Sequence, residues 1–127
     1  MTARALLSAL ALLAASAPTA GAAEWEFIGT QQANFKGDRD VIKVRGHEGH
    51  RAIRICVEMA PLKMLDLDVV YGNGERQDIQ VRSQFEPGSC TRVIDLKGKR
   101  RDIDRISMVY SRVRGQDPAV VFVYAMR

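Results

Sequence analysis

AIRICVEM (residues 52–59) and LDLDVVYGNG (residues 65–74) decide the fold class of this chain. In both stretches apolar residues recur at every second position, as Ile53, Ile55 and Val57 do, with polar residues between them. Side chains with this period alternate between the two faces of a strand, one packed on a core and one in water. Asn73 and Gly74 tolerate the positive φ of a tight turn, so we predict a hairpin whose return strand covers about 76–82.

The same reading extends outward over the rest of the chain. Short extended segments separated by turn residues are typical of a sandwich or a barrel. We therefore predict an all-β, single-domain antiparallel β-sandwich of about eight strands, with a small closed β-barrel as the alternative. AVVFVYAM, at 119–126, is apolar at nearly every position, which predicts a central strand covered on both faces. The expected strands are 25–31, 40–45, 52–59, 65–71, 76–82, 90–96, 103–110 and 119–126.

The first 22 residues have the features of a secretory signal peptide. Arg4 supplies a basic start, residues 5–15 are apolar, and Ala20-Gly21-Ala22 forms an A-x-A cleavage site. The apolar stretch is shorter than the roughly 20 residues that cross a bilayer. We expect cleavage before Ala23, a β-sandwich domain at 23–127 with no transmembrane segment, and a periplasmic or secreted location.

Length and charge exclude several classes of protein. A chain of 127 residues with a net charge of +4 has room for one domain, which excludes a multidomain enzyme and a cytosolic factor dependent on ATP or NAD. Its basic residues are too few and too dispersed for the concentrated stripe that binds nucleic acid. A nucleic-acid partner is therefore not expected.

Four short motifs follow one another in the chain: WEFIGT (25–30), DRDVI (38–42), VYGNG (70–74) and RVIDLKG (92–98). Their order resembles that of a family of small, exported bacterial proteins of unknown function, over roughly residues 25–124. The resemblance implies a compact all-β protein that is periplasmic or secreted. It implies no activity and supplies no catalytic residues to transfer.

Cys56 and Cys90 are the two cysteines of the chain. In an exported protein they favour a disulfide, because oxidising compartments preserve such bonds. Closing this loop would stabilise the fold by up to about 4 kcal/mol. Two free thiols are the alternative, and a redox pair is disfavoured because the C-x-x-C spacing is missing.

His47 and His50 lie in the segment GHEGH at 46–50, and two imidazoles beside a carboxylate are reasonable ligands for Zn²⁺ or Cu²⁺. The spacing differs from the helical H-E-x-x-H motif, and glycines surround the histidines. An exposed turn is therefore the ordinary alternative to a metal site.

The run Lys97, Lys99, Arg100 and Arg101 is the most concentrated positive charge in the sequence. It could bind phosphate, sulfate or carboxylate groups of an anionic envelope polymer. The alternative is a solvated turn whose charges discourage association at a sheet edge.

Aromatic residues suggest a third kind of site, because aromatic rings bind sugars by stacking. Most of them fall on apolar strand faces and are expected in the core. Trp25 begins the first expected strand, where exposure is easiest, and is our candidate binding aromatic.

No catalytic constellation or cofactor motif stands out, so we predict a protein that is not an enzyme and needs no cofactor. The expected function is that of an exported module that binds or stabilises something in the cell envelope. Its partner would be an anionic envelope polymer or another envelope protein. A carbohydrate-binding module and a small metal-binding protein using His47 and His50 are the alternatives.

Overall fold

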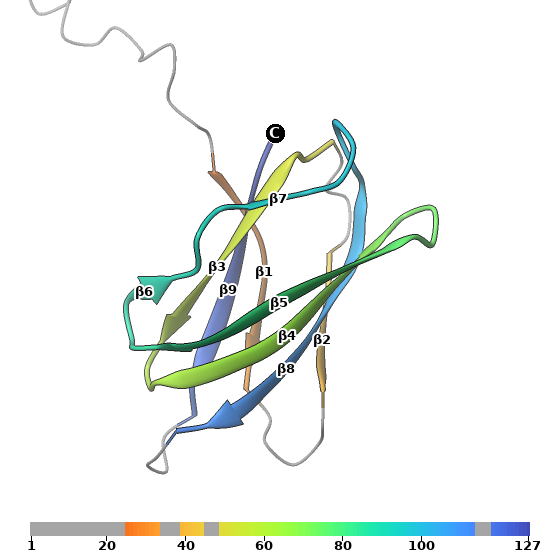
Figure 1. Cartoon of the computed structure of the whole chain (residues 1–127). Coiled ribbons are helices and arrows are strands. Elements are labelled where there is room, and N and C mark those ends of the chain that lie inside the picture. Colours follow the sequence, from red (N-terminus) through yellow and green to blue (C-terminus); the bar gives the residue numbers. More distant parts are fainter. Residues whose placement is uncertain (1–24, 34–38, 45–48, 114–117) are drawn as a thin grey trace, which may run out of the picture.

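The computed structural model describes residues 25–33, 39–44, 49–113 and 118–127, and over these ranges the protein is all-β. The strands form two antiparallel sheets (Figure 1). One sheet has the order β1-β9-β3-β6, with β7 also paired to β3, and the other has the order β2-β8-β4-β5. The strands are β1 (Trp25–Gln32), β2 (Asp40–Lys43), β3 (Ala52–Glu58), β4 (Leu62–Tyr71), β5 (Arg76–Phe85), β6 (Ser89–Cys90), β7 (Ile94–Asp95), β8 (Ile103–Arg112) and β9 (Val120–Met126).

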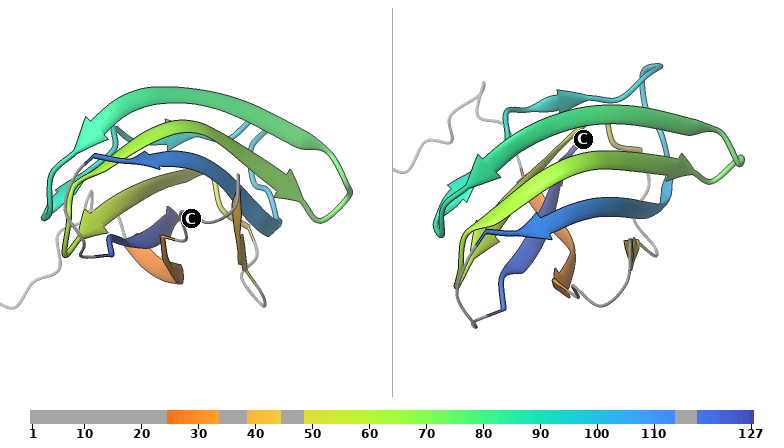
Figure 2. Two further views of the ribbon diagram at one scale, coloured as in Figure 1. Left: turned by 90° about the horizontal axis from the view of Figure 1, so that it is seen from below. Right: turned by 60° about the horizontal axis from the view of Figure 1, so that its bottom comes forward.

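The two sheets pack face to face, with β8, β4 and β5 arching over β3, β9 and β1 (Figure 2). Alternate side chains of both sheets fill the space between them. Among the fully buried ones are Ile53, Ile55, Leu67, Met108 and Val123. This confirms the predicted β-sandwich over the closed barrel. No helix in the described ranges is long and apolar enough to cross a membrane.

The predicted hairpin joins β4 to β5, and its turn differs in detail from the expected one. Gly74 N–H donates to the Tyr71 carbonyl at 2.9 Å, and Tyr71 N–H donates to the Glu75 carbonyl at 2.9 Å. The loop therefore has three residues, and within it Gly74 adopts a φ of 92°. Asn73 instead accepts a hydrogen bond from Glu75 N–H through its side-chain oxygen. The amide thus stabilises the turn without taking up a positive φ.

The expected strand at 90–96 is two short strands, β6 and β7. Between them Thr91 binds β3 through both its backbone and its side chain. Thr91 N–H donates to the Ile55 carbonyl at 2.8 Å, while the Thr91 hydroxyl accepts from Ile55 N–H at 3.0 Å. A side-chain oxygen has replaced a backbone carbonyl as acceptor, which interrupts the ladder.

β9 lies between β1 and β3 as a central strand, but the expectation that both its faces are covered was wrong. Val121, Val123 and Ala125 point into the sandwich and are fully buried. The alternate residues, including Phe122 and Tyr124, point away from it and are half-buried. Apolar side chains are therefore displayed on the outside of this sheet.

Candidate binding face

Four aromatic side chains gather on the outside of the β1-β9-β3 sheet. Phe122 and Tyr124 come from β9, and the register places Tyr124 opposite Phe27 and Met126 opposite Trp25. Phe27 is 50% exposed, and the other three are half-buried. We call Trp25, Phe27, Phe122 and Tyr124 the aromatic face.

The rings of the aromatic face are in contact. The centroid of the Phe27 ring lies 6.2 Å from that of Phe122 and 5.9 Å from that of Tyr124. These separations and tilted geometries are those of favourable aromatic pairs. From β3, the guanidinium carbon of Arg54 lies 4.6 Å from the centroid of the Trp25 ring, a cation–π contact. A cation therefore lies within the aromatic face.

Phe27 lies just before a β-bulge in β1. It is exposed opposite Tyr124 and Ile28 is buried in the core, and the register with β9 shifts between Phe27 and Gly29. Gly29 is required there, because a Cβ at this position would lie 2.6 Å from a methyl carbon of Ile42 in β2. The two sheets thus approach closely at this point, next to the aromatic face.

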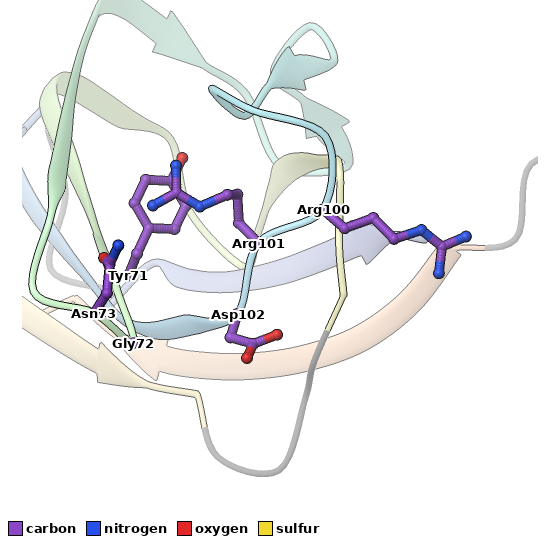
Figure 3. A pocket seen from close by; sticks show the side chains of 6 residues that line it. All are labelled: Tyr71, Gly72, Asn73, Arg100, Arg101 and Asp102. Carbon is purple, nitrogen blue, oxygen red and sulfur yellow. The ribbon is translucent and has the colours of Figure 1, made fainter.

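The basic run does not act as one patch. Arg101 lies with its guanidinium carbon 3.8 Å from the centroid of the Tyr71 ring (Figure 3). It also pairs with the Glu75 carboxylate and donates to the Lys97 carbonyl at 2.9 Å. Arg101 therefore joins its own turn to the β4–β5 hairpin, whereas Lys97, Lys99 and Arg100 are exposed.

These contacts change the acidity of two groups beside Arg101. Burial raises the pKa of the Tyr71 hydroxyl above its ordinary value, and the Arg101 charge opposes part of that increase. The pKa of the Glu75 carboxyl is lowered, first by the hydrogen bond from Asn73 and then by Arg101. At neutral pH the Tyr71 hydroxyl is therefore uncharged and the Glu75 carboxylate is negatively charged, so the Arg101–Glu75 pair is ionic.

A hollow of about 320 Å³ lies beside this cluster, lined by Tyr71, Gly72, Asn73, Arg100, Arg101 and Asp102. In Figure 3 the Arg100 side chain points away from Arg101 and Tyr71. Asp102 accepts a hydrogen bond from Gly49 N–H at 2.9 Å. With Arg101 occupied by Tyr71 and Glu75, this hollow offers little free positive charge to an anionic ligand.

His50 is buried, so the expectation of an exposed turn was wrong for this residue. Its side chain is 0% exposed, and Nε2 lies 2.7 Å from Oε1 of Glu26 in β1. Its backbone pairs with that of Arg101 as an isolated bridge. His47 lies outside the described residues. Within the described ranges, no three His, Cys, Asp or Glu side chains come close enough to hold a metal ion.

Cys56 and Cys90 form a disulfide between β3 and β6, which confirms the predicted bond. The two residues are directly opposite in the register, with Cα atoms 3.9 Å apart. Cys56 is also opposite Phe122 of β9. Because cross-strand partners point to the same face, the disulfide lies on the outside of the sheet, beside the aromatic face.

Sequence reasoning found Trp25 but missed Arg54 and the display of Phe27, Phe122 and Tyr124. A signal for the display was present, since AVVFVYAM places aromatic residues at alternate positions among small aliphatic ones. Nothing in the sequence signalled the contact of Arg54 with Trp25, because it joins two strands that are not adjacent in the chain.

A family described as "Domain of unknown function (DUF2541)" matches residues 5–125. The chain belongs to the DUF2541 family. This confirms the predicted membership of an uncharacterised family. No curated protein sequence matches the chain.

Two solved structures resemble this DUF2541 domain. AlgX of Pseudomonas aeruginosa matches with a TM-score of 0.53 and 11% identity, over 80% of this chain and 26% of AlgX. The chain therefore spans about a quarter of the AlgX structure, and the likeness shows the fold alone. A variant of a family 29 carbohydrate-binding module, studied for ligand recognition, matches with a TM-score of 0.40 and 11% identity, over 83% of this chain and 93% of that one.

Proposed function

We propose that this domain is a non-enzymatic binding module of the cell envelope, periplasmic or secreted, and that it binds carbohydrate on the aromatic face. The observation that carries the proposal is the exposure of Phe27 beside Trp25, Phe122 and Tyr124 on one sheet surface. A protein of this size normally needs its aromatic residues in the core. Contiguous apolar surface left outside the core commonly marks an interaction site.

The chemistry of the face suits a sugar. The polarised C–H groups of a pyranose ring pack on the negatively polarised face of an aromatic ring. Arg54 supplies hydrogen-bond donors next to Trp25, from a side chain that is only partly buried. A ligand hydroxyl or carboxylate can accept from the exposed part of its guanidinium. Apolar contact with a few fixed donors is the usual composition of a small-ligand site.

The test is binding of the purified, disulfide-intact protein to polysaccharides, measured by affinity electrophoresis in dextran, hydroxyethylcellulose and polygalacturonate, and by pull-down with peptidoglycan sacculi. We expect Phe27→Ala and Tyr124→Ala to reduce binding. The matched control is Val41→Ala, because Val41 is 43% exposed on the other sheet. Far-UV circular dichroism establishes that each variant is folded.

Binding that is retained by both aromatic variants, or binding to none of the polymers, would overturn the proposal. Capture of another envelope protein through the same face, without polysaccharide binding, would also overturn it. The export component is tested separately by intact mass, because cleavage before Ala23 leaves a chain that begins AEWEF.

A further inference from the structure

The aromatic face ends at a hollow that contains two cations. The hollow has a volume of about 480 Å³, and its lining includes Arg51, Ala52, Asp95, Leu96, Lys99 and Met126. Met126 is the cross-strand partner of Trp25 in β1 and of Ala52 in β3. Met126 therefore connects the hollow to the row of the aromatic face that contains Trp25.

Positive charge is concentrated at this end of the sheet. Arg51 and Lys99 both line the hollow and are exposed, and Asp95 is the opposing carboxylate in its lining. Arg54 follows Ala52 along β3 on the same outward face and leads from the hollow to Trp25. The acidic residue Glu58 lies at the opposite end of β3, in register with Val120. Within the part of the chain that the structure describes, Arg51, Lys99 and Arg54 therefore place positive charge at and beside the hollow, where a ligand on this face would meet it.

We propose that the ligand is an acidic polysaccharide, and that Arg51 and Lys99 bind one of its carboxylate or sulfate groups in this hollow. The inference rests on the proposed carbohydrate-binding function. Outward side chains along one strand are about 7 Å apart, so the row from Phe122 through Tyr124 to Met126 is about 13 Å long. That length suits an extended chain of sugar units, whose rings stack on the aromatic residues while an acidic substituent reaches the hollow.

The two cations have complementary abilities. The guanidinium of Arg51 presents a planar pair of donors that matches a carboxylate or sulfate. The ammonium of Lys99 is a compact charge on a flexible stem and can follow a substituent whose position varies along the polymer. Asp95 offsets part of this charge and leaves the hollow with one net positive charge. So small a charge holds a free ion weakly, and a ligand gains more when its sugar rings also stack on the aromatic face.

The test compares polygalacturonate with its fully methyl-esterified form, which has the same backbone without the charges. We expect the acid form to bind more tightly, and its affinity to fall as salt is raised. Arg51→Gln and Lys99→Gln should each weaken binding of the acid form by about two- to fivefold, the range expected for an exposed ion pair. Binding of the ester should not change. Arg100→Gln is the matched control, because Arg100 is an exposed cation of the same turn that lines the other hollow.

Dextran sulfate and dextran form a second pair of probes, and preference for the sulfated polymer alone assigns the hollow to sulfate rather than carboxylate. Equal binding of charged and neutral polymers, with Lys99→Gln and Arg51→Gln unchanged, would overturn the inference and leave carbohydrate binding standing. Equal losses from Arg100→Gln and Lys99→Gln would also overturn it, because the effect would then be general charge. Absence of binding to every polymer would instead overturn the proposed function.

Discussion

Replacement of Arg101 by Ala should lower the free energy of unfolding by about 2–4 kcal/mol, although the residue belongs to a surface turn. Arg101 is 18% exposed, and its guanidinium lies on the ring of Tyr71, which is 2% exposed. A largely desolvated cation–π contact contributes about 1–2 kcal/mol. The charged hydrogen bond to the Lys97 carbonyl adds about 1–2 kcal/mol. The ion pair with Glu75 adds only a small, salt-dependent contribution, because water screens that exposed carboxylate.

The measurement is a set of urea-unfolding curves followed by circular dichroism. Arg101→Lys keeps the charge but loses the planar group that stacks on Tyr71, so its loss should be intermediate. Arg100→Ala is the control, because Arg100 is the exposed neighbour in the same turn, and its change should stay within about 0.5 kcal/mol. Equal effects of Arg100→Ala and Arg101→Ala would refute the assignment of Arg101 as the residue that anchors the turn.

The pH dependence of the same curves supplies a second check. The pKa of Glu75 is lowered in the folded protein, by Asn73 first and Arg101 second, from an ordinary value of 4.5. The stability that this carboxylate contributes is therefore present above pH 4.5 and is lost as the pH falls through the folded-state pKa. Glu75→Gln should lack this component of acid sensitivity. If the difference in unfolding free energy between wild type and Glu75→Gln stayed the same from pH 7 to pH 2, that result would contradict the contacts of Glu75 with Asn73 and Arg101.

Two further predictions concern stability. The Cys56–Cys90 bond spans a sequence separation of 34 residues, so replacing both cysteines by alanine should lower the unfolding free energy in urea by up to about 4 kcal/mol. A loss below about 1 kcal/mol would mean that the hydrogen bonds of Thr91 hold this segment in place without the disulfide. Gly74 has a φ of 92° and nothing lies within 4 Å of a Cβ placed there, so Gly74→Val should lower the unfolding free energy by about 1–2 kcal/mol through backbone strain alone. Gly74→Asn should lose less, because asparagine tolerates this conformation better. The opposite order would exclude strain as the cause.

The parts of the fold that were predictable depend on local pattern. Alternation in the 52–59 and 65–71 segments identified β3 and β4, because half-burial of a strand is visible in its own residues. The hairpin after Tyr71 followed from turn chemistry, which is also local. The disulfide required no knowledge of the topology, since the chain has two cysteines and their pairing depends on the expected compartment.

The parts that could not be predicted depend on partners distant in the chain. GHEGH reads as a loop, but His50 is buried because its backbone pairs with Arg101 and its ring meets Glu26 from β1. The inward position of Arg101 likewise depends on Tyr71, which lies 30 positions earlier. A run of basic residues shows how much charge a turn carries, and it does not show which members find acceptors.

The ambiguity of β9 has a different origin. A strand that is apolar on both sides is either covered on both faces or displays one of them, and the two cases have the same sequence pattern. What separates them is whether another layer exists to cover the second face. Here β2, β8, β4 and β5 all lie on the inner side of the β1-β9-β3 sheet, so in the described structure no strand packs over Phe122 and Tyr124.

The position of the basic turn makes stability and binding separable by mutation. Within five residues, Lys99 lines the hollow next to Met126, while Arg101 lines the one beside Tyr71. Arg101 anchors the turn through its contacts with Tyr71 and Glu75. It thereby holds the backbone from which the Lys99 side chain reaches the hollow next to Met126. Arg101 variants should therefore change the unfolding free energy with little direct effect on a bound polymer, and Lys99 variants should do the reverse. If Arg101→Lys, studied where the protein is fully folded, weakened polymer binding as much as Lys99→Gln did, the two sides of the turn would not be independent.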